Sequence, residues 1–326
     1  MRSASYNPTN SHRALCAFTL LELLVALAVF SLICILLSSM TGESLRLLRL
    51  SSSQSQVFQN ARSALETMSA SITAATMNPY WDYDNANTPT RYLRRSWLAF
   101  VSGRATSILG SGYDPGQCVF FLAPGGLLAD SSNRRLNQTL NTYGFFIEYR
   151  NANQVAPSFM NLPQRKRYLL MKAQSSGESM QLFSTRMGNP ADNEWITSTL
   201  PDARILAENI VMLVIRPKAS DGSDLAGANY AFDTRVGETS NPQPVTANQL
   251  PPFLEITLVA VSEESMKRKN PELGYVFSSS DLAGLFTQPA SFTQDLESFQ
   301  RILVQNQLEF RVFQQQIALP NSKWSQ

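Results

Sequence analysis

An almost uninterrupted apolar run near the start of the chain, from Ala17 to about Met40, constrains the fold most, because one carboxylate, Glu22, lies near its beginning. As a helix, a run of this length spans the hydrocarbon core of a bilayer, which is about 30 Å thick. An acidic side chain inside that core costs on the order of 2.5–3.5 kcal/mol on insertion scales. We therefore expect the run to be a membrane anchor and Glu22 to have a function that involves a charged partner.

The residues around Glu22 form a specific string. A leader, Met1–Ala17, carries two arginines and no acid, and Phe18-Thr-Leu-Leu-Glu22 follows it. This arrangement resembles the N-terminal segment of type IV pilins and pseudopilins. The resemblance implies that a prepilin peptidase cuts between Ala17 and Phe18 and methylates the new amine. The family prefers glycine before the cut, so Ala17 departs from the pattern, and the leader is long for the family.

The resemblance also implies a role for the acid in assembly. In a bundle of such helices, Glu22 of one subunit would meet the charged amine of Phe18 on a neighbour, and the two buried charges would offset each other. Two alternatives stay open. Glu22 lies about 6 Å of helix from Phe18, so it can snorkel to the headgroups of an ordinary anchor. A cleavable secretory signal is the other alternative, but the run is longer than such a signal and lacks an Ala-x-Ala-like end near Ser38.

Charge argues against a nucleic-acid surface. Removal of the leader takes away two of the 27 basic side chains and leaves 25, against 25 acidic ones. Phosphate binding needs clustered lysine and arginine. The short clusters Arg165-Lys166-Arg167 and Lys267-Arg268-Lys269 are interpreted as solvated turns.

Histidine and cysteine are scarce. The single histidine, His12, lies in the predicted leader, so a mature protein would lack Ser-His-Asp catalysis and His-ligated metal sites. Cys118 would be alone in the outer domain, because Cys16 leaves with the leader and Cys34 lies in the apolar run. Cys118 is set in Cys-Val-Phe-Phe-Leu, which is typical of a buried small hydrophobe. We therefore predict that the protein is not an enzyme.

The helical pattern continues beyond the apolar run. Apolar residues recur from Leu50 to Ile72 at spacings of seven, four and three, which predicts one helix over 18–77. Asn78-Pro79 would end it. The inner half is apolar all round, with a transmembrane part at about 18–40, whereas the outer half has one apolar stripe that we expect to pack on a sheet.

Strand patterns dominate the rest of the chain. The predicted strands are Trp97–Val101, Cys118–Leu122, Tyr143–Tyr149, Tyr168–Met171, Asn209–Ile215, Phe253–Val261 and Leu308–Val312. The polar segment Asp221–Pro252 is predicted as a long surface connection. A late helix is expected at about 292–304, with Ser291 or Thr293 as its cap.

These elements predict an α+β fold in which a long N-terminal helix packs on an antiparallel β-sheet head. The expected organisation is a leader at 1–17, a helix at 18–77 and a β-rich outer domain at 78–326. Ala207–Val211 and Leu250–Leu258 resemble the outer domain of the larger minor pseudopilins, the J type of type II secretion systems. The ending from Phe310 to Ser325 is similar to the Verru_Chthon cassette proteins, a pilin-like group.

No metal site or cofactor is predicted, and the nearest candidate is a calcium loop. Asp82, Asp84, Asn85 and Asn87 supply closely spaced oxygens, but the EF-hand spacing fails at Ala86. An Asx turn is the alternative.

Other candidate sites are weaker. Asp221-Gly-Ser-Asp224 is a common turn sequence. The glycines of Gly103–Gly116 fit no phosphate-binding motif. Glu263-Glu264 is interpreted as solvated surface. The aromatic residues of Tyr80–Tyr83 and Tyr92–Trp97 are expected to be buried rather than displayed.

The function predicted from these patterns is a minor pilin or pseudopilin, a structural subunit of a type IV pilus or a type II secretion-like filament. Its expected partners are the prepilin peptidase, other pilin subunits and the inner membrane, with the outer domain in the periplasm or outside the cell. A membrane-tethered adhesin or ligand-binding module that does not polymerise is the alternative. A membrane-anchored hydrolase that uses carboxylates is a third.

Overall fold

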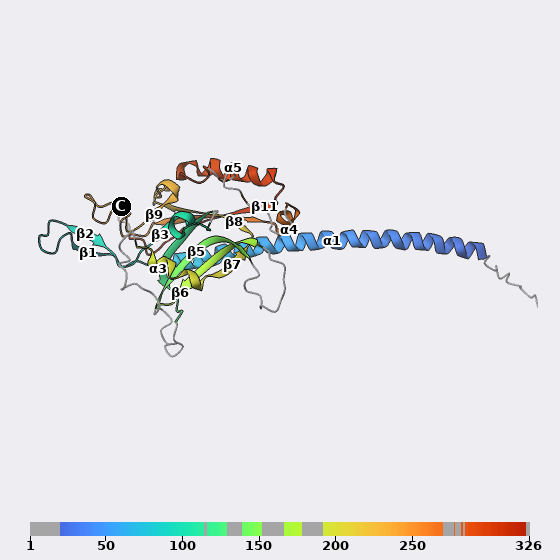
Figure 1. The fold of residues 1–326 in the computed structure, drawn as a ribbon, viewed down its shortest axis with the longest axis horizontal. Helices are drawn as coiled ribbons and strands as arrows, with labels where there is room; N and C mark the ends of the chain where they lie inside the picture. The colour runs from blue at the N-terminus through green and yellow to red at the C-terminus, as the bar shows by residue number, and fades with distance from the viewer. Residues whose placement is uncertain are drawn as a thin grey trace, which may run out of the picture. The chain divides into compact units, whose positions relative to one another are not determined.

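The computed structural model describes residues 20–113, 116–128, 139–151, 166–177, 192–269, 277, 282 and 284–323. It has the predicted α+β architecture: a long helix, α1 (Leu20–Thr73), precedes a head built of antiparallel sheets (Figure 1). The chain divides into two compact units, Met1–Ser52 and Ser53–Gln326. The second unit holds the outer part of α1 and all the strands.

Six strands form the larger sheet, in the order β7-β6-β5-β4-β3-β9, and every neighbouring pair is antiparallel. Their bounds are β3 Val101–Arg104, β4 Gln117–Pro124, β5 Leu140–Asn151, β6 Lys166–Ser175, β7 Arg204–Glu208 and β9 Phe232–Asp233. A separate hairpin joins β1 (Tyr80–Tyr83) to β2 (Tyr92–Arg95). The sequence patterns did not predict β1, β2, β7 or β9.

Three strands form the smaller sheet, in the order β11-β10-β8. They are β8 (Ile210–Lys218), β10 (Phe253–Val261) and β11 (Phe310–Ala318). The last six residues of β10 and the first six of β8 are all buried, as their continuous apolar runs predict. The two sheets are linked where Gln117 Oε1 accepts a hydrogen bond of 2.6 Å from the backbone N–H of Ile215.

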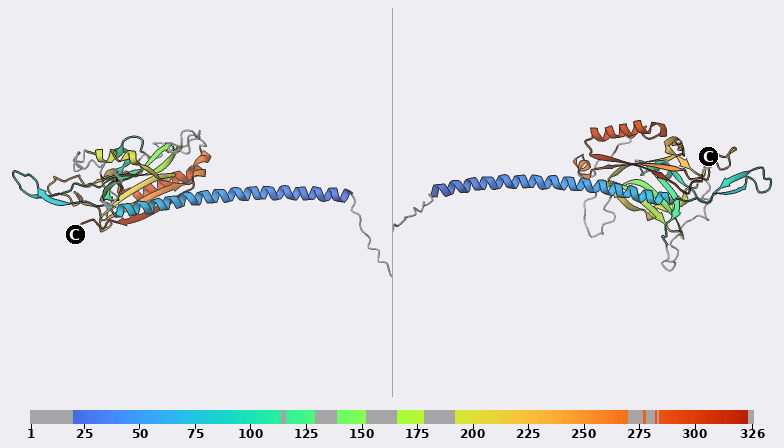
Figure 2. Two further views of the ribbon diagram at one scale, coloured as in Figure 1. Left: turned by 90° about the horizontal axis from the view of Figure 1, so that it is seen from below. Right: turned by 180° about the vertical axis from the view of Figure 1, so that it is seen from behind.

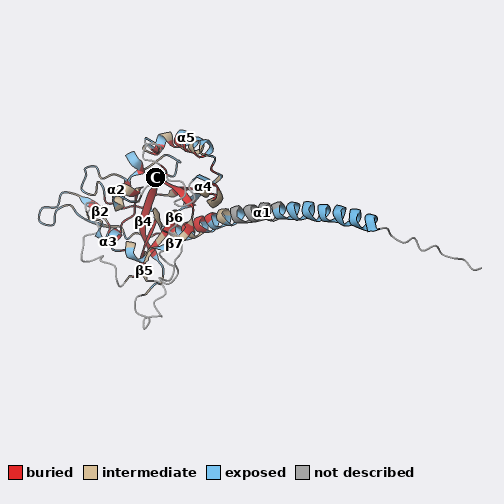
Figure 3. Cartoon of the chain, turned by 45° about the vertical axis from the view of Figure 1, so that its right-hand side comes forward, coloured by how far each residue is buried: buried red, intermediate tan, exposed pale blue. Residues whose placement is uncertain are grey.

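The outer part of α1 packs on the core through its predicted stripe. Ala61, Leu65, Met68 and Ile72 are buried and share one apolar cluster with residues of both sheets (Figure 3). A buried aliphatic side chain of this size contributes about 1.5–3 kcal/mol relative to an exposed one. The opposite face of the larger sheet has a second core, where Phe120 and Phe146 pack with Trp195 of the short helix α3 (Glu194–Thr197).

The end of α1 differs from the prediction. The helix stops at Thr73 rather than near Met77, because the backbone N–H of Thr76 donates to the carbonyl of Leu122 in β4 at 2.8 Å. The same contact explains the late start of β3. In the β3–β4 register Val101 lies opposite Phe120, so Thr76 occupies the place beside Leu122 that Ala99 would take. Trp97–Phe100 are therefore not part of the strand.

The segment predicted as a surface connection, Asp221–Pro252, is partly interior. It supplies β9, which pairs with β3 at the edge of the larger sheet. Arg235 in this segment is only 1% exposed, and its guanidinium donates to the carboxylate of Asp233 and to the backbone carbonyl of Asp192. The surface prediction was wrong here because local polarity does not show that an arginine is buried by bonding to a nearby acid and to a distant carbonyl.

Two helices complete the head. The segment predicted as a solvated turn is instead helix α4 (Glu263–Lys269), whose Met266 is buried. Helix α5 (Phe292–Gln305) lies where it was expected, and Ser291 is at its N-cap. The Ser291 hydroxyl does not cap a backbone N–H; it donates to the carboxylate of Asp295 at 2.7 Å.

Candidate functional site

The inner part of α1, Leu20–Gly42, is exposed along its whole length. Over Leu20–Gly42 no residue is buried, and the large apolar side chains are between 47% (Ile33) and 83% (Leu20) exposed. In the described part of the chain this is the one helix long and apolar enough to cross a membrane. An exposed apolar surface of this extent fits a single-pass anchor, because contact between this surface and water would be strongly unfavourable.

Three hydroxyl groups of this segment donate hydrogen bonds within the helix. The hydroxyls of Ser31, Ser39 and Thr41 donate to the carbonyls three or four residues earlier, at 2.8–2.9 Å. Such bonds matter in a bilayer, where an unpaired polar group costs several kcal/mol. Glu22 is the only acidic or basic residue of the segment. It lies in the first turn of α1, where free backbone N–H groups favour a negative charge.

The predicted processing site lies outside the described residues, since these begin at Leu20. Cleavage between Ala17 and Phe18, and the pairing of Glu22 with the amine of Phe18, therefore stay predictions. The leader, 1–17, is outside the described residues as well.

The predicted calcium loop forms the turn between β1 and β2. The carboxylate of Asp84 accepts hydrogen bonds from the hydroxyl and backbone N–H of Thr90 and from the N–H of Asn85, and these bonds hold the pKa of Asp84 well below its usual range. Asn85 Oδ1 accepts from the N–H of Asn87 at 2.9 Å. Asp82 lies 3.8 Å from the guanidinium of Arg95. The turn thus uses these oxygens for internal hydrogen bonds, as an Asx turn does.

No three His, Cys, Asp or Glu side chains in the described ranges are placed to share a metal ion. Calcium binding by Asp82, Asp84, Asn85 and Asn87 stays an untested alternative to the prediction of no metal site, and a bound ion would have to replace the bonds that Asp84 makes to Thr90.

The second acidic turn is tied to a neighbouring strand. Asp221 accepts from the N–H and hydroxyl of Ser223, whereas Asp224 lies 3.0 Å from Arg216 and 2.9 Å from Lys218. Burial raises the pKa of Asp224, but the bonds from Arg216 and Lys218 outweigh it and leave the pKa below its usual value.

In the pair Glu263-Glu264, interpreted from the sequence as solvated surface, Glu263 makes ion pairs with neighbouring basic residues. Glu263 lies 2.5 Å from Arg167 of β6 and 2.7 Å from Lys267, and Arg167 also pairs with Glu208. These ion pairs connect α4 to the larger sheet. The basic residues Lys166 and Arg167, predicted to be in a turn, are at the start of β6, while Arg165 lies outside the described residues.

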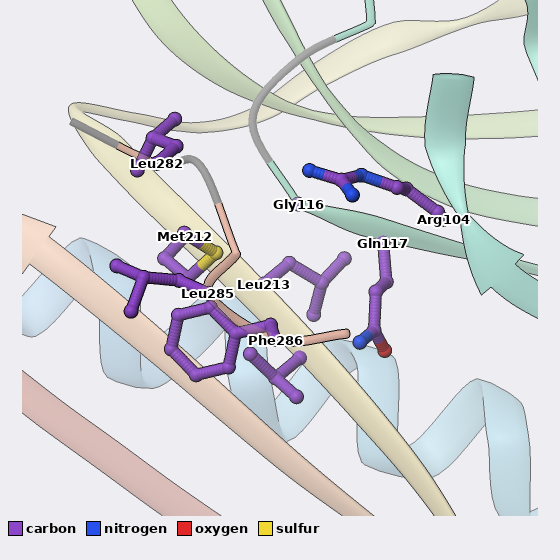
Figure 4. Close-up of a pocket in the computed structure, with 9 residues that line it drawn as sticks. Arg104, Gly116, Gln117, Met212, Leu213, Leu282, Leu285 and Phe286 are labelled. Carbon is purple, nitrogen blue, oxygen red and sulfur yellow. The ribbon is translucent and has the colours of Figure 1, made fainter. Parts of the chain in front are cut away.

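A small cavity lies between the start of β4, strand β8 and the side chains of Leu282, Leu285 and Phe286 (Figure 4). Its volume of about 20 Å³ is roughly that of one water molecule. Gln117 is 3% exposed; its Oε1 accepts from Ile215, but its Nε2 has no partner among the described residues. The side chains of Arg104 and Gln117 run in different directions in Figure 4. The cavity therefore suits a bound water more than a reacting group.

Cys118 is completely buried, as its apolar surroundings predict, and burial raises the pKa of its thiol. The aromatic residues after α1 contradict their prediction. Trp81 is 65% exposed, Tyr92 62% and Trp97 50%. A signal was present in the sequence: Trp81 and Tyr83 alternate with the polar Asp82, which places them on one face of a strand.

Comparison with known proteins adds little. No family model matches the chain, and no curated protein matches it. Among solved structures it is similar to the type IV-like pilin TTHA1219 from Thermus thermophilus, with 8% sequence identity over 81% of this chain and 97% of that one. The TM-score is 0.36, which does not establish a common fold.

Proposed function

We propose that the protein is a non-enzymatic, membrane-anchored subunit of the pilin type, assembled through α1 with other subunits into a pilus or a secretion-like filament. The observation that carries the proposal is the exposed apolar helix Leu20–Gly42. Its first turn holds one acid, Glu22, which ends the sequence Phe18-Thr-Leu-Leu-Glu22. The finer assignment is a minor pilin or pseudopilin of the J-type or Verru_Chthon kind, stored in the inner membrane with its head in the periplasm or outside the cell.

The two parts of α1 would do different work. The outer part, through Ala61, Leu65, Met68 and Ile72, is already used to hold the head together. The inner part, Leu20–Gly42, has no buried residue, and its apolar surface can pack against lipid or against the same helix of neighbouring subunits. Glu22 would set the register of that packing by meeting the methylated amine of Phe18 on the next subunit.

The first test is the mature N-terminus. We expect mass spectrometry of membrane-extracted protein, from cells with an active prepilin peptidase, to show a chain that begins with N-methylated Phe18. Retention of Met1–Ala17 in such cells would contradict the proposal.

The second test concerns Glu22. We expect Glu22→Gln to insert into the membrane as the wild type does, resistant to alkaline extraction, but to be lost from purified filaments. Ser39→Ala is the matched control, because its hydroxyl bonds only to Leu36 of its own helix. A Glu22→Gln protein that enters filaments as well as the control would contradict the role of Glu22, and absence of the wild type itself from purified filaments would favour an anchor that does not polymerise.

That alternative, a tethered ligand-binding module, is favoured by one observation, the display of aromatic side chains on the β1–β2 hairpin. A subunit at the tip of a filament would also fit this display, and the presence or absence of the wild type in purified filaments distinguishes the two.

A further inference from the structure

The β1–β2 hairpin follows directly on the end of α1 and projects from the head in every view (Figures 1 and 2). Its register sets Trp81 opposite Arg94 and Tyr83 opposite Tyr92. Because residues two apart on a strand, and residues paired across two strands, share a face, Trp81, Tyr83 and Tyr92 lie on one face of the hairpin. We call these three side chains the aromatic face.

The aromatic face is exposed although the hairpin is firmly held. Leu93, on the other face, is 1% exposed. Arg91 donates to the carbonyls of Thr239 and Ser240 at 2.6 and 2.7 Å, and Arg94 donates to the carbonyl of Ala247 at 2.8 Å. Asp84 closes the turn. The rings are thus displayed by an ordered scaffold, which lowers the entropy that a ligand must overcome.

The rings offer a flat, amphipathic surface. Tyr83 and Tyr92 stack with centroids 5.0 Å apart, and their hydroxyls are 3.4 Å apart. Trp81 is 65% exposed and has the guanidinium of Arg94 at 6.0 Å from its ring centroid. Large aromatic side chains in water are costly unless they are covered, so a surface of this kind indicates a binding site.

Local charge identifies the class of ligand. The three arginines of the hairpin are equal in number to the three acids beside them. Arg91 lies 3.9 Å from Asp84, and Arg95 lies 3.8 Å from Asp82 and 3.7 Å from Glu238. Arg94 is bonded to backbone carbonyls. Phosphates need free cations, so this surface does not suit a nucleic acid or an anionic lipid. The adjoining turn instead exposes the amide side chains of Asn85 and Asn87 and the hydroxyl of Thr88.

We propose that the aromatic face binds a neutral carbohydrate chain. The C–H faces of successive sugar rings stack on Trp81 and on the Tyr83–Tyr92 pair, and the amides and hydroxyls of the turn bond the sugar hydroxyls. The aromatic face and its surroundings carry no net charge, so they favour a neutral glycan over a charged one. The proposal holds whether or not the chain enters a filament, so Glu22→Gln does not affect it.

The test is a binding measurement on the full chain in detergent micelles. The probes are cello- and chito-oligosaccharides, a thymidine oligonucleotide and phosphatidylcholine vesicles. We expect the oligosaccharides to bind and Trp81→Ala and Tyr92→Ala each to weaken their binding about tenfold or more. Trp81→Phe, which retains a ring, should keep part of the affinity, and Val304→Ala, an exposed apolar residue of α5, should match the wild type.

Circular dichroism of each variant checks that the head is folded. The proposal is overturned if no oligosaccharide binds to the folded wild type, if Trp81→Ala and Val304→Ala bind equally well, or if only the oligonucleotide or the vesicles bind.

Discussion

Arg235 is the largest side chain that the described head buries completely. Its guanidinium donates to both carboxylate oxygens of Asp233, to the carbonyl of Asp192 and to Asn193 Oδ1. A buried cation is tolerated only when its donors are used in this way. At the residue scale, the contrast is with Glu22, which lies on the exposed first turn of α1.

We expect Arg235→Met to lower the free energy of unfolding by about 3–5 kcal/mol, because it removes the guanidinium donors of Asp233, of the Asp192 carbonyl and of Asn193 Oδ1 and leaves Asp233 only the backbone N–H of residue 235. Chemical denaturation followed by tryptophan fluorescence measures this. Arg62→Met is the control, since the ion pair of Arg62 with Glu66 is exposed and its loss should cost less than about 1 kcal/mol. Equal effects of the two changes would contradict the role of Arg235.

The hairpin turn should respond to acid through Asp84. Hydrogen bonds from Thr90 hold the pKa of Asp84 below its usual value near 4, so the ionised carboxylate stabilises the turn. A lowered pKa in the folded state means that this contribution is complete above about pH 4 and is lost as the pH falls through the folded pKa.

Hydrogen exchange of the hairpin amides, corrected for the intrinsic rate, checks this prediction. We expect protection of the segment from Asp84 to Tyr92 to decline below about pH 4 in the wild type. In Asp84→Asn it should be weak at every pH. A turn whose protection is the same at pH 6 in both proteins would show that the carboxylate is dispensable.

At the scale of elements, close packing between strands decides several positions. Gly144 of β5 lies opposite Phe120 of β4, and a Cβ at Gly144 would overlap the Phe120 ring. Phe120 cannot move freely, because it is fully buried and packs on Phe146 and Trp195. Glycine is therefore required here by space rather than by backbone conformation.

We expect Gly144→Ala to destabilise the head by about 1–3 kcal/mol through overpacking. Phe120→Leu in the same chain should recover part of that loss by making room. The control is Gly227→Ala, where the nearest atom to an added Cβ is the Ala231 carbonyl at 3.8 Å. Thermal unfolding curves compare the variants, and a Gly144→Ala midpoint equal to that of the control would contradict the packing argument.

At the scale of the whole molecule, the chain divides between Ser52 and Ser53 into a unit with the exposed apolar helix and a unit with the packed head. The unit Ser53–Gln326 contains both apolar cores, whereas Leu20–Gly42 contributes no buried residue. Folding of the head should therefore not depend on the anchor.

We expect a fragment that starts at Ser53 to be soluble without detergent and to unfold in one cooperative transition, because the α1 residues that it retains complete the core. Near-ultraviolet circular dichroism during heating measures this. A second fragment that starts after Ile72 should lose the transition, since it exposes the faces of both sheets that α1 covers. A Ser53 fragment without a cooperative transition would show that the inner helix takes part in folding the head.

The sequence by itself determined the apolar segment, the helix, seven of the eleven strands of the described residues in outline and the burial of Cys118, because these depend on local apolar periodicity and on the length of an apolar run. Only the tertiary structure decided where α1 ends, that β9 comes from Asp221–Pro252 and that Arg235 is buried. Each of these depends on which distant backbone group or acid occupies a place, such as Leu122 for Thr76 or Asp233 for Arg235. Apolar periodicity can be recognised from residues that are close in sequence. Whether a buried polar group has a hydrogen-bond partner depends on residues that are close only in space.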